Sequence, residues 1–197
     1  MDGIKYSVII PMYNEQEVIK ESYRRLDGVM RPLGEEYELI FVNDGSRDKT
    51  MEIMLEIANN DKHVKIVDFA RNFGHQTAVT AGMKYSSGDA VVIIDADLQD
   101  PPELIPGMLE KWKEGYEVVY GKRLKREGET KFKLFTAKAF YKVINSLSGN
   151  MIPMDTGDFR LIDRAVVDAM NAMPEHNRFL RGMGSWVGFR QYAYEYK

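Results

Sequence analysis

The chain contains no cysteine, no long apolar run and no strong excess of basic residues. Without cysteine it can form neither a disulfide framework nor a cysteine-ligated zinc site. No segment approaches the roughly 18 consecutive apolar residues of a transmembrane helix, and residues 1–5 lack the apolar core of a signal peptide. The formal net charge of -3 argues against a nucleic-acid partner, which usually requires a basic surface. We therefore expect the chain on its own to be soluble.

Two common phosphate-binding motifs are also absent. No Gly-x-Gly-x-x-Gly follows the first apolar segment, and no Gly-x-x-x-x-Gly-Lys-Ser/Thr occurs anywhere in the chain. These absences exclude the usual dinucleotide-binding and P-loop sites. A phosphate-containing ligand would have to be held in another way, for example by a metal ion together with a basic loop.

What the sequence does contain is an alternation of short apolar segments with segments of helical periodicity. With 197 residues and 44% hydrophobic content the chain can bury one full core, and such alternation is typical of parallel βαβ units. The predicted strands cover residues 6–10, 39–43, 64–69, 91–95, 118–120 and 159–162, and the predicted helices cover residues 17–30, 49–60, 74–85, 102–114 and 131–147. We expect one α/β domain with a single, mostly parallel sheet flanked by helices. Residues 189–197 alternate like a strand and then stop, as in an excised domain.

Two carboxylates stand where the apolar run of the fourth predicted strand ends, Asp95 and Asp97. Ligands of open α/β sheets bind beyond the carboxyl ends of the strands. Carboxylates at that place suit Mg²⁺ or Mn²⁺, which leave part of their coordination shell to water and substrate phosphates. This interpretation predicts a diphosphate substrate. The alternative is that both residues only cap the helix opened by the two prolines that follow.

The first two predicted strands end in polar segments of the same kind. Residues 11–15 follow the first strand and residues 43–48 follow the second, so that three strand ends carry carboxylates at one edge of the sheet. Turn formation alone accounts for Asn43-Asp44-Gly45. It does not account for carboxylates at all three strand ends.

Five segments taken in order resemble the inverting family 2 glycosyltransferases. The closest resemblance is to the polyprenyl-phosphate branch, which includes dolichyl-phosphate mannosyltransferase and bacterial undecaprenyl-phosphate glucosyltransferases. The segments are residues 11–15, 42–50, 70–76, 95–102 and 155–161. The resemblance implies a GT-A (nucleotide-diphospho-sugar transferase) fold over residues 1–197, with a nucleotide-sugar-binding half at 1–121 and an acceptor-side half at 122–197. Members usually continue into an amphipathic segment and two membrane-spanning helices, which we expect in the full-length protein and which this sequence lacks.

The resemblance also implies a donor site. Asp95, Asp97 and Gln99 would hold Mg²⁺ or Mn²⁺ and, through it, the donor diphosphate. The implied nucleotide-sugar-binding residues are Pro11, Tyr13, Asn14, Glu15, Asp44, Arg71, Asn72, Asp95, Ala96 and Asp97. Asn14 or Glu15 could instead only cap the helix that follows. A lone histidine near a helix start is more often a capping or packing residue than a base, so we do not expect His75 to be catalytic.

The acceptor side is expected in the second half of the chain. The implied contacts for a lipid phosphate are Lys122, Arg123, Arg126 and Arg181, and the implied catalytic or charge-positioning residues are Asp155, Asp158 and Arg160. Each has a structural alternative. The basic run could be an ordinary solvated loop, and Arg160 or Arg181 could belong to structural ion pairs. The aromatic residues of the helix at 131–147 are expected mostly in the core.

Together these features predict an inverting, metal-dependent transferase that moves a hexose from a nucleotide-diphosphate sugar, with UDP-glucose as the expected donor. The predicted acceptor is a polyprenyl phosphate such as undecaprenyl phosphate, at the cytoplasmic face of the cell membrane. One alternative is a family 2 transferase acting on a polysaccharide hydroxyl, for which a base at Asp155 or Asp158 would be obligatory. Another is a non-enzymatic nucleotide-sugar-binding module. The sequence reveals neither the donor sugar nor whether the chain forms a homo-oligomer.

Overall fold

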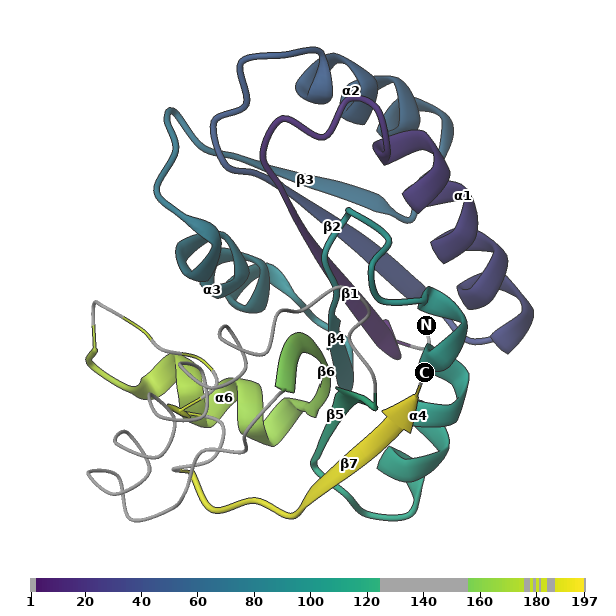
Figure 1. The fold of residues 1–197 in the computed structure, drawn as a ribbon, viewed down its shortest axis with the longest axis vertical. Coiled ribbons are helices and arrows are strands. Elements are labelled where there is room, and N and C mark those ends of the chain that lie inside the picture. Colours follow the sequence, from purple (N-terminus) through teal and green to yellow (C-terminus); the bar gives the residue numbers. More distant parts are fainter. Residues whose placement is uncertain are drawn as a thin grey trace.

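The structure is a computed structural model that describes residues 3–124, 156–175, 178, 180, 182, 183 and 187–196. Within these residues one sheet has the strand order β3-β2-β1-β4-β6-β5-β7 (Figure 1). Its strands are β1 (Tyr6–Met12), β2 (Tyr37–Asn43), β3 (Val64–Asp68), β4 (Ala90–Ile93), β5 (Val118–Arg123), β6 (Thr156–Asp163) and β7 (Gln191–Tyr196). The helices are α1 (Ile19–Met30), α2 (Thr50–Asn60), α3 (His75–Tyr85), α4 (Ile105–Lys113) and α6 (Arg164–Ala172), with short 3-10 turns η1 (Arg31–Leu33) and η2 (Pro102–Leu104).

The sheet is mostly parallel, as the sequence predicted. Strands β3, β2, β1 and β4 pair in parallel, and β7 pairs in parallel with β5. Strand β6 runs antiparallel to both of its neighbours, β4 and β5. It therefore begins at the edge where β4 and β5 end, and Thr156 lies opposite Lys122. This reversal brings residues from late in the chain to the ligand-binding edge of the sheet.

Two layers of helices cover the sheet, one on each face (Figure 1). Along β1 the side chains alternate, since Val8 and Ile10 pack with α1, α2 and α4, whereas Ile9 packs with α3 and α6. Both faces are buried, which is why the central strands are continuously apolar in sequence. The middle of the sheet thus forms a rigid support for the loops at its carboxyl edge.

The predicted strands and the first four predicted helices correspond to elements of the structure with small shifts at their ends. The alternation at 189–197 forms β7, at the edge of the sheet beside β5. The helix predicted at 131–147 lies outside the described residues. Within the described part of the chain, no helix combines the length and the apolarity needed to cross a membrane.

Candidate functional site

The loops after β1 and β2 are joined by hydrogen bonds. The backbone N–H of Asn14 donates to Ser46 Oγ at 3.0 Å, and the backbone N–H of Arg47 donates to Asn14 Oδ1 at 2.8 Å. Asn14 adopts a positive φ of 57° to make this connection. Helix α1 has Val18 at its N-cap position and no side-chain cap, so the alternative that Asn14 or Glu15 only caps this helix is wrong. The two loops form one unit that presents Tyr13 and Glu15 at the sheet edge.

Asp44 fastens a third loop to this unit. It is only 3% exposed, and its carboxylate accepts the backbone N–H of Phe73 at 2.6 Å and that of Gly74 at 2.9 Å. Beside it, Gly45 has a φ of 67°, and a Cβ there would lie 2.3 Å from the carbonyl carbon of Arg71. Only glycine permits this approach. Asp44 therefore shapes the wall of the predicted donor site, and a direct contact between its carboxylate and the nucleotide stays a prediction.

The second and third loops enclose a hollow of about 420 Å³ at the carboxyl ends of β2 and β3. Two predicted donor residues, Arg71 and Asn72, line it, and Arg47 adds a second guanidinium. The guanidinium of Arg71 stacks 3.9 Å from the ring centroid of Phe73, which restricts its position. Basic and polar groups of this kind suit an anionic, planar ligand.

Asp95 and Asp97 follow β4 at the same edge. Asp95 is partly exposed, and Asp97 is exposed and accepts the backbone N–H of Gln99 at 3.0 Å. The intervening loop includes Leu98 at a φ of 60°, a strained conformation for a leucine and one that is found mainly where function requires it. Neither η2 nor α4 has a side-chain cap, so the alternative that these Asp residues serve only as helix caps is wrong. Their neighbours Pro11 and Ala96 are buried.

The electrostatics of Glu15 show that the carboxylates lie close enough to repel one another. Burial first, and then the negative charges of Asp97, Asp95 and Asp48, raise the pKa of Glu15 above its ordinary value of 4.5. Among the described residues, neither Glu15 nor Asp97 forms an ion pair. The edge of the sheet therefore carries negative charge that a bound cation would neutralise.

The donor atoms present fit Mg²⁺ or Mn²⁺. The described residues contain no cluster of three or more His, Asp or Glu side chains that would hold a metal by themselves. Mg²⁺ is usually bound through one or two carboxylates and completes its shell with water and substrate phosphates. Asp95 and Asp97, with the Gln99 amide, provide such an incomplete set.

His75 lies between two carboxylates of the site. Its Nε2 is 2.8 Å from Asp95 Oδ1, and its Nδ1 is 3.9 Å from Asp158 Oδ2. Asp95 follows β4 and Asp158 lies near the start of β6, so the ring connects the predicted donor side with the predicted acceptor side. From the sequence, no role in the site is predicted for His75.

Two of the predicted acceptor-side residues lie at the start of β6. Asp158 faces His75, and Arg160 is buried with its guanidinium near the carbonyl oxygens of Gly157 and Asp158, at 3.3 Å and 3.4 Å. The Nη2 atom of Arg160 is also 3.9 Å from Asp158 Oδ1. Arg160 thus supports the segment that carries Asp158, and its contact with a substrate phosphate stays a prediction. Asp155, Arg126 and Arg181 lie outside the described residues.

The other two predicted acceptor contacts, Lys122 and Arg123, are already bound to carboxylates. Lys122 Nζ lies 2.8 Å from Glu195 Oε1, and Arg123 Nη2 lies 2.9 Å from Asp100 Oδ1. Arg123 also donates to the carbonyl oxygen of Gln99, and the hydroxyl of Tyr196 donates to Asp100. Burial first, and then the bond to Asp100, raise the pKa of Tyr196 to about 12. Arg123 therefore holds the loop that carries the predicted metal ligands, and its acceptor role stays a prediction.

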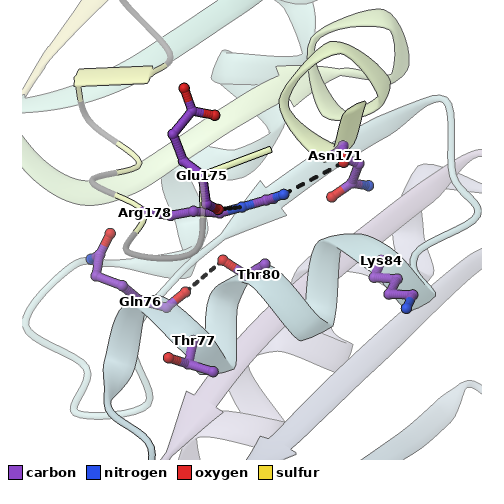
Figure 2. Close-up of a pocket in the computed structure, with 7 residues that line it drawn as sticks. All are labelled: Gln76, Thr77, Thr80, Lys84, Asn171, Glu175 and Arg178. Carbon is purple, nitrogen blue, oxygen red and sulfur yellow. Dashed lines mark hydrogen bonds between the residues drawn. The ribbon is translucent and has the colours of Figure 1, made fainter. Parts of the chain in front are cut away.

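A cavity of about 610 Å³ lies apart from the carboxylates, between α3 and the segment after α6 (Figure 2). Arg178 closes the end of α6, because its Nη2 donates to the carbonyl oxygens of Asn171 and Met173. Gln76 reaches into the same space from the start of α3, and its Oε1 accepts the backbone N–H of Leu180 at 3.1 Å. Gln76 lines this cavity and directly follows His75, so the cavity adjoins the site.

Sequence reasoning missed His75, Gln76 and Asp100 as parts of the site. Gln76 and Asp100 stand inside motif segments but have no distinctive spacing of their own. His75 had one usable signal, since it starts a helix directly after a strand-end loop, where side chains face the ligand edge of the sheet.

Comparisons with known proteins agree with this geometry. The model of glycosyl transferase family 2 matches residues 7–170. The chain is 59% identical over 193 residues to "Uncharacterized glycosyltransferase YkcC" of Bacillus subtilis, covering 98% of this chain and 60% of the relative. It is 42% identical to the "Bactoprenol glucosyl transferase" of Shigella phage SfV, covering 98% of this chain and 63% of that protein. The chain thus spans about 60% of the length of these relatives.

Solved structures share the fold. A mannosyltransferase from Pyrobaculum calidifontis in complex with GDP-Man and Mn²⁺ superimposes with a TM-score of 0.68 at 20% identity, over 99% of this chain and 55% of that one. The S. aureus TarS 1–349 structure with UDP gives a TM-score of 0.67 at 20% identity, over 98% of this chain and 59% of that one. The fold is the GT-A fold, as predicted, and the chain belongs to glycosyl transferase family 2.

Proposed function

We propose that this chain is the catalytic domain of an inverting, metal-dependent hexosyltransferase that uses UDP-glucose as donor and a polyprenyl phosphate as acceptor. The observation that carries the proposal is the meeting of Glu15, Asp95 and Asp97 at one edge of the sheet, where burial and then the charges of the two Asp residues raise the pKa of Glu15. The relatives named bactoprenol glucosyl transferases favour the lipid-phosphate acceptor.

On this proposal the nucleotide lies along the ends of β1 and β2 and the loop after β3. Pro11 lies near the end of β1 and Tyr13 directly follows the strand, and Asn14 and Asp44 fix the loops that face the base and ribose. Arg71 and Asn72 supply polar contacts from the hollow beside them. Asp95, Asp97 and Gln99 would hold Mg²⁺ or Mn²⁺, which when bound supplies positive charge to the departing diphosphate.

The reaction is a single displacement. A phosphate oxygen of the acceptor forms a bond to the sugar C1 as the bond from C1 to the donor diphosphate breaks, and the nucleoside diphosphate leaves. The acceptor phosphate, with a second pKa of about 6 by analogy with phosphorylated side chains, is largely dianionic at neutral pH. The protein then has mainly to orient two anions and manage their charge. Asp158 or Asp155 would position the acceptor, and Lys122, Arg123, Arg126 and Arg181 would attract its phosphate, which for Lys122 and Arg123 requires their carboxylate pairs to open.

Calorimetric binding of nucleotide sugars tests the donor half. UDP-glucose, UDP-GlcNAc, GDP-mannose and a UDP-aminoarabinose analogue are titrated with and without Mn²⁺ into the wild-type chain and into Asp97→Asn. We expect binding of UDP-glucose that requires Mn²⁺ and is lost in Asp97→Asn. Asp168→Asn, an exposed carboxylate on α6, is the matched control and should bind like the wild type.

Transfer assays with undecaprenyl phosphate as the acceptor test the acceptor half. Transfer of glucose to undecaprenyl phosphate supports the proposal, and the Asp158→Asn variant should slow it without abolishing it. Complete loss in Asp158→Asn together with transfer to a polysaccharide would indicate a hydroxyl acceptor. Saturable binding with neither transfer nor slow hydrolysis would indicate a binding module.

A further inference from the structure

The ring of His75 has a defined orientation that its neighbours explain. The backbone N–H of Leu180 donates to Gln76 Oε1 at 3.1 Å, which places the amide nitrogen Nε2 of Gln76 toward the ring. This nitrogen lies 3.3 Å from His75 Nδ1. Because an amide nitrogen only donates, Nδ1 must be the acceptor, and in the neutral ring the proton then sits on Nε2.

The proton on Nε2 is directed at Asp95. The distance of 2.8 Å to Asp95 Oδ1 is that of a hydrogen bond, whereas the 3.9 Å between Nδ1 and Asp158 is too long for one. His75 thus donates to the carboxylate expected to bind the metal. Asp158 lies close enough to contribute electrostatically.

The backbone of His75 is fixed as well. His75 is the first residue of α3, and the two N–H groups before it, from Phe73 and Gly74, donate to the buried carboxylate of Asp44. A ring held on one side by Asp44 through the backbone and on the other by Gln76 has little freedom to follow a moving carboxylate. The Asp95 side chain is therefore the partner that adjusts.

Without the hydrogen bond from His75, the Asp95 side chain would be free to rotate away from the site. Its side chain is 39% exposed, and its charge and that of Glu15 repel each other. A hydrogen bond from a fixed ring opposes that rotation. Hydrogen-bond partners of metal-binding side chains act in this way in many proteins, and losing one costs about 10- to 100-fold in metal affinity or activity.

We propose that His75 is a positioning residue, which holds Asp95 in the orientation that binds the donor's metal ion and so couples the metal site to the Gln76–Leu180 contact. This inference rests on the proposed function. It assigns the ring a role through Asp95 and requires no contact between His75 and substrate.

The test compares two amides of different length, His75→Gln and His75→Asn. The Gln amide nitrogen can reach the place of Nε2 and donate to Asp95, whereas the shorter Asn side chain cannot. Free Mn²⁺ is measured by electron paramagnetic resonance during titration of Mn²⁺ into each variant, in the presence of the nucleoside diphosphate that the wild type binds. We expect His75→Asn to raise the apparent Kd for Mn²⁺ by about 10- to 100-fold, and His75→Gln to remain close to the wild type.

Thermal unfolding separates positioning from folding. Both variants and the control Thr77→Ala, an exposed residue on the same helix, should be folded at the titration temperature and unfold at similar midpoints. Equal Mn²⁺ affinities of the Gln and Asn variants would overturn the inference while leaving the proposed function intact. If the wild type itself binds no Mn²⁺ with any nucleotide, the proposed function is overturned first, and the inference with it.

Discussion

The two ends of the central strands differ in how the charges of their carboxylates are compensated. At the amino ends, Glu38 is 1% exposed, yet it pairs with Lys65 and accepts hydrogen bonds from Ser7 Oγ at 2.6 Å and from the backbone N–H of Ser87 at 2.7 Å. Although burial acts to raise its pKa, these partners outweigh burial and hold the pKa of Glu38 below its ordinary value. The charge is fully compensated within the protein.

At the carboxyl ends, buried Asp44 is compensated by two backbone N–H groups, but for the partly buried Glu15 the balance is reversed. Burial and neighbouring carboxylates raise the pKa of Glu15, and neither Glu15 nor Asp97 forms an ion pair within the described residues. The contrast teaches that one end of the sheet is arranged for stability, while the other retains carboxylate charge that no ion pair within the described residues compensates. Stability is commonly given up in this way at functional sites.

The largest effect on donor affinity is expected when a carboxylate near one end of β4 is neutralised, and the matched control neutralises a carboxylate near the other end. Asp95→Asn removes a charge after β4, and Asp89→Asn removes one before it, where Asp89 pairs with Lys5 on the surface. We expect Asp95→Asn to weaken Mn²⁺-dependent donor binding by at least about 100-fold, since even indirect partners of metals are worth 10- to 100-fold. The melting temperature of Asp95→Asn should stay close to that of the wild type, because the Asn oxygen can still accept the hydrogen bond from His75 while the repulsion of Glu15 is relieved. Calorimetry measures the donor affinity and thermal unfolding measures the melting temperature. Equal donor affinities of Asp95→Asn and Asp89→Asn would contradict the contrast between the two ends of the sheet.

A second variant should lower stability without lowering donor affinity. Glu38→Gln keeps an acceptor for Ser7 and Ser87 but places an amide against Lys65. Hydrogen bonds to charged groups contribute roughly 1.5–3 kcal/mol, and for a domain of this size each kcal/mol shifts the melting temperature by about 2–4 °C. A decrease of several degrees is therefore expected at pH 7.

The same variant has a defined pH dependence. Because the pKa of Glu38 is lowered in the folded protein, its stabilising effect is complete above the ordinary value of 4.5 and is lost as the pH falls through the folded-state pKa. The difference in melting temperature between Glu38→Gln and the wild type should therefore shrink below pH 4.5. A difference that stays constant well below pH 4.5, in a range where both proteins are still folded, would contradict a charged Glu38.

The smallest effect is expected from Glu15→Gln, with the opposite sign. A raised folded-state pKa means that ionisation of Glu15 costs stability, so the neutral variant should melt slightly higher at pH 7 and match the wild type below about pH 4.5. Saturating Mn²⁺ and nucleotide should reduce the gain, because the bound cation compensates the charge in the wild type. Melting curves with and without these ligands measure the effect, and a lower melting temperature at pH 7 would contradict it.

Much of the fold could be predicted because the central strands are buried on both faces. Continuous apolar runs such as residues 91–94 mark parallel strands, and the polar residues after them mark the ligand edge. This pattern was enough to predict the placement of Asp95 and Asp97 at that edge. It was not enough to predict the antiparallel direction of β6, since the sequence of β6 resembles that of any buried strand.

The individual contacts were less predictable. Asp44 was expected to face the nucleotide, but both of its oxygens accept backbone N–H groups from a loop about 30 residues away. Arg123 was expected to contact the acceptor phosphate, which stays a prediction, and its ion pair with Asp100 was not foreseen. Such partners are brought together by the tertiary fold, so that no local spacing in the sequence reveals them. The same holds for His75, whose helix-start position gave no hint that Gln76 would orient its ring.

The reversed direction of β6 has a consequence for how the carboxyl edge of the sheet is assembled. Because Lys122 of β5 lies opposite Thr156 of β6, strand β6 starts at the edge where β5 ends, and its third residue, Asp158, lies 3.9 Å from His75 at the start of α3. One reversed strand thus lets a late part of the chain add side chains to an edge that the early parallel strands build, while β1, β2 and β4 keep their parallel register.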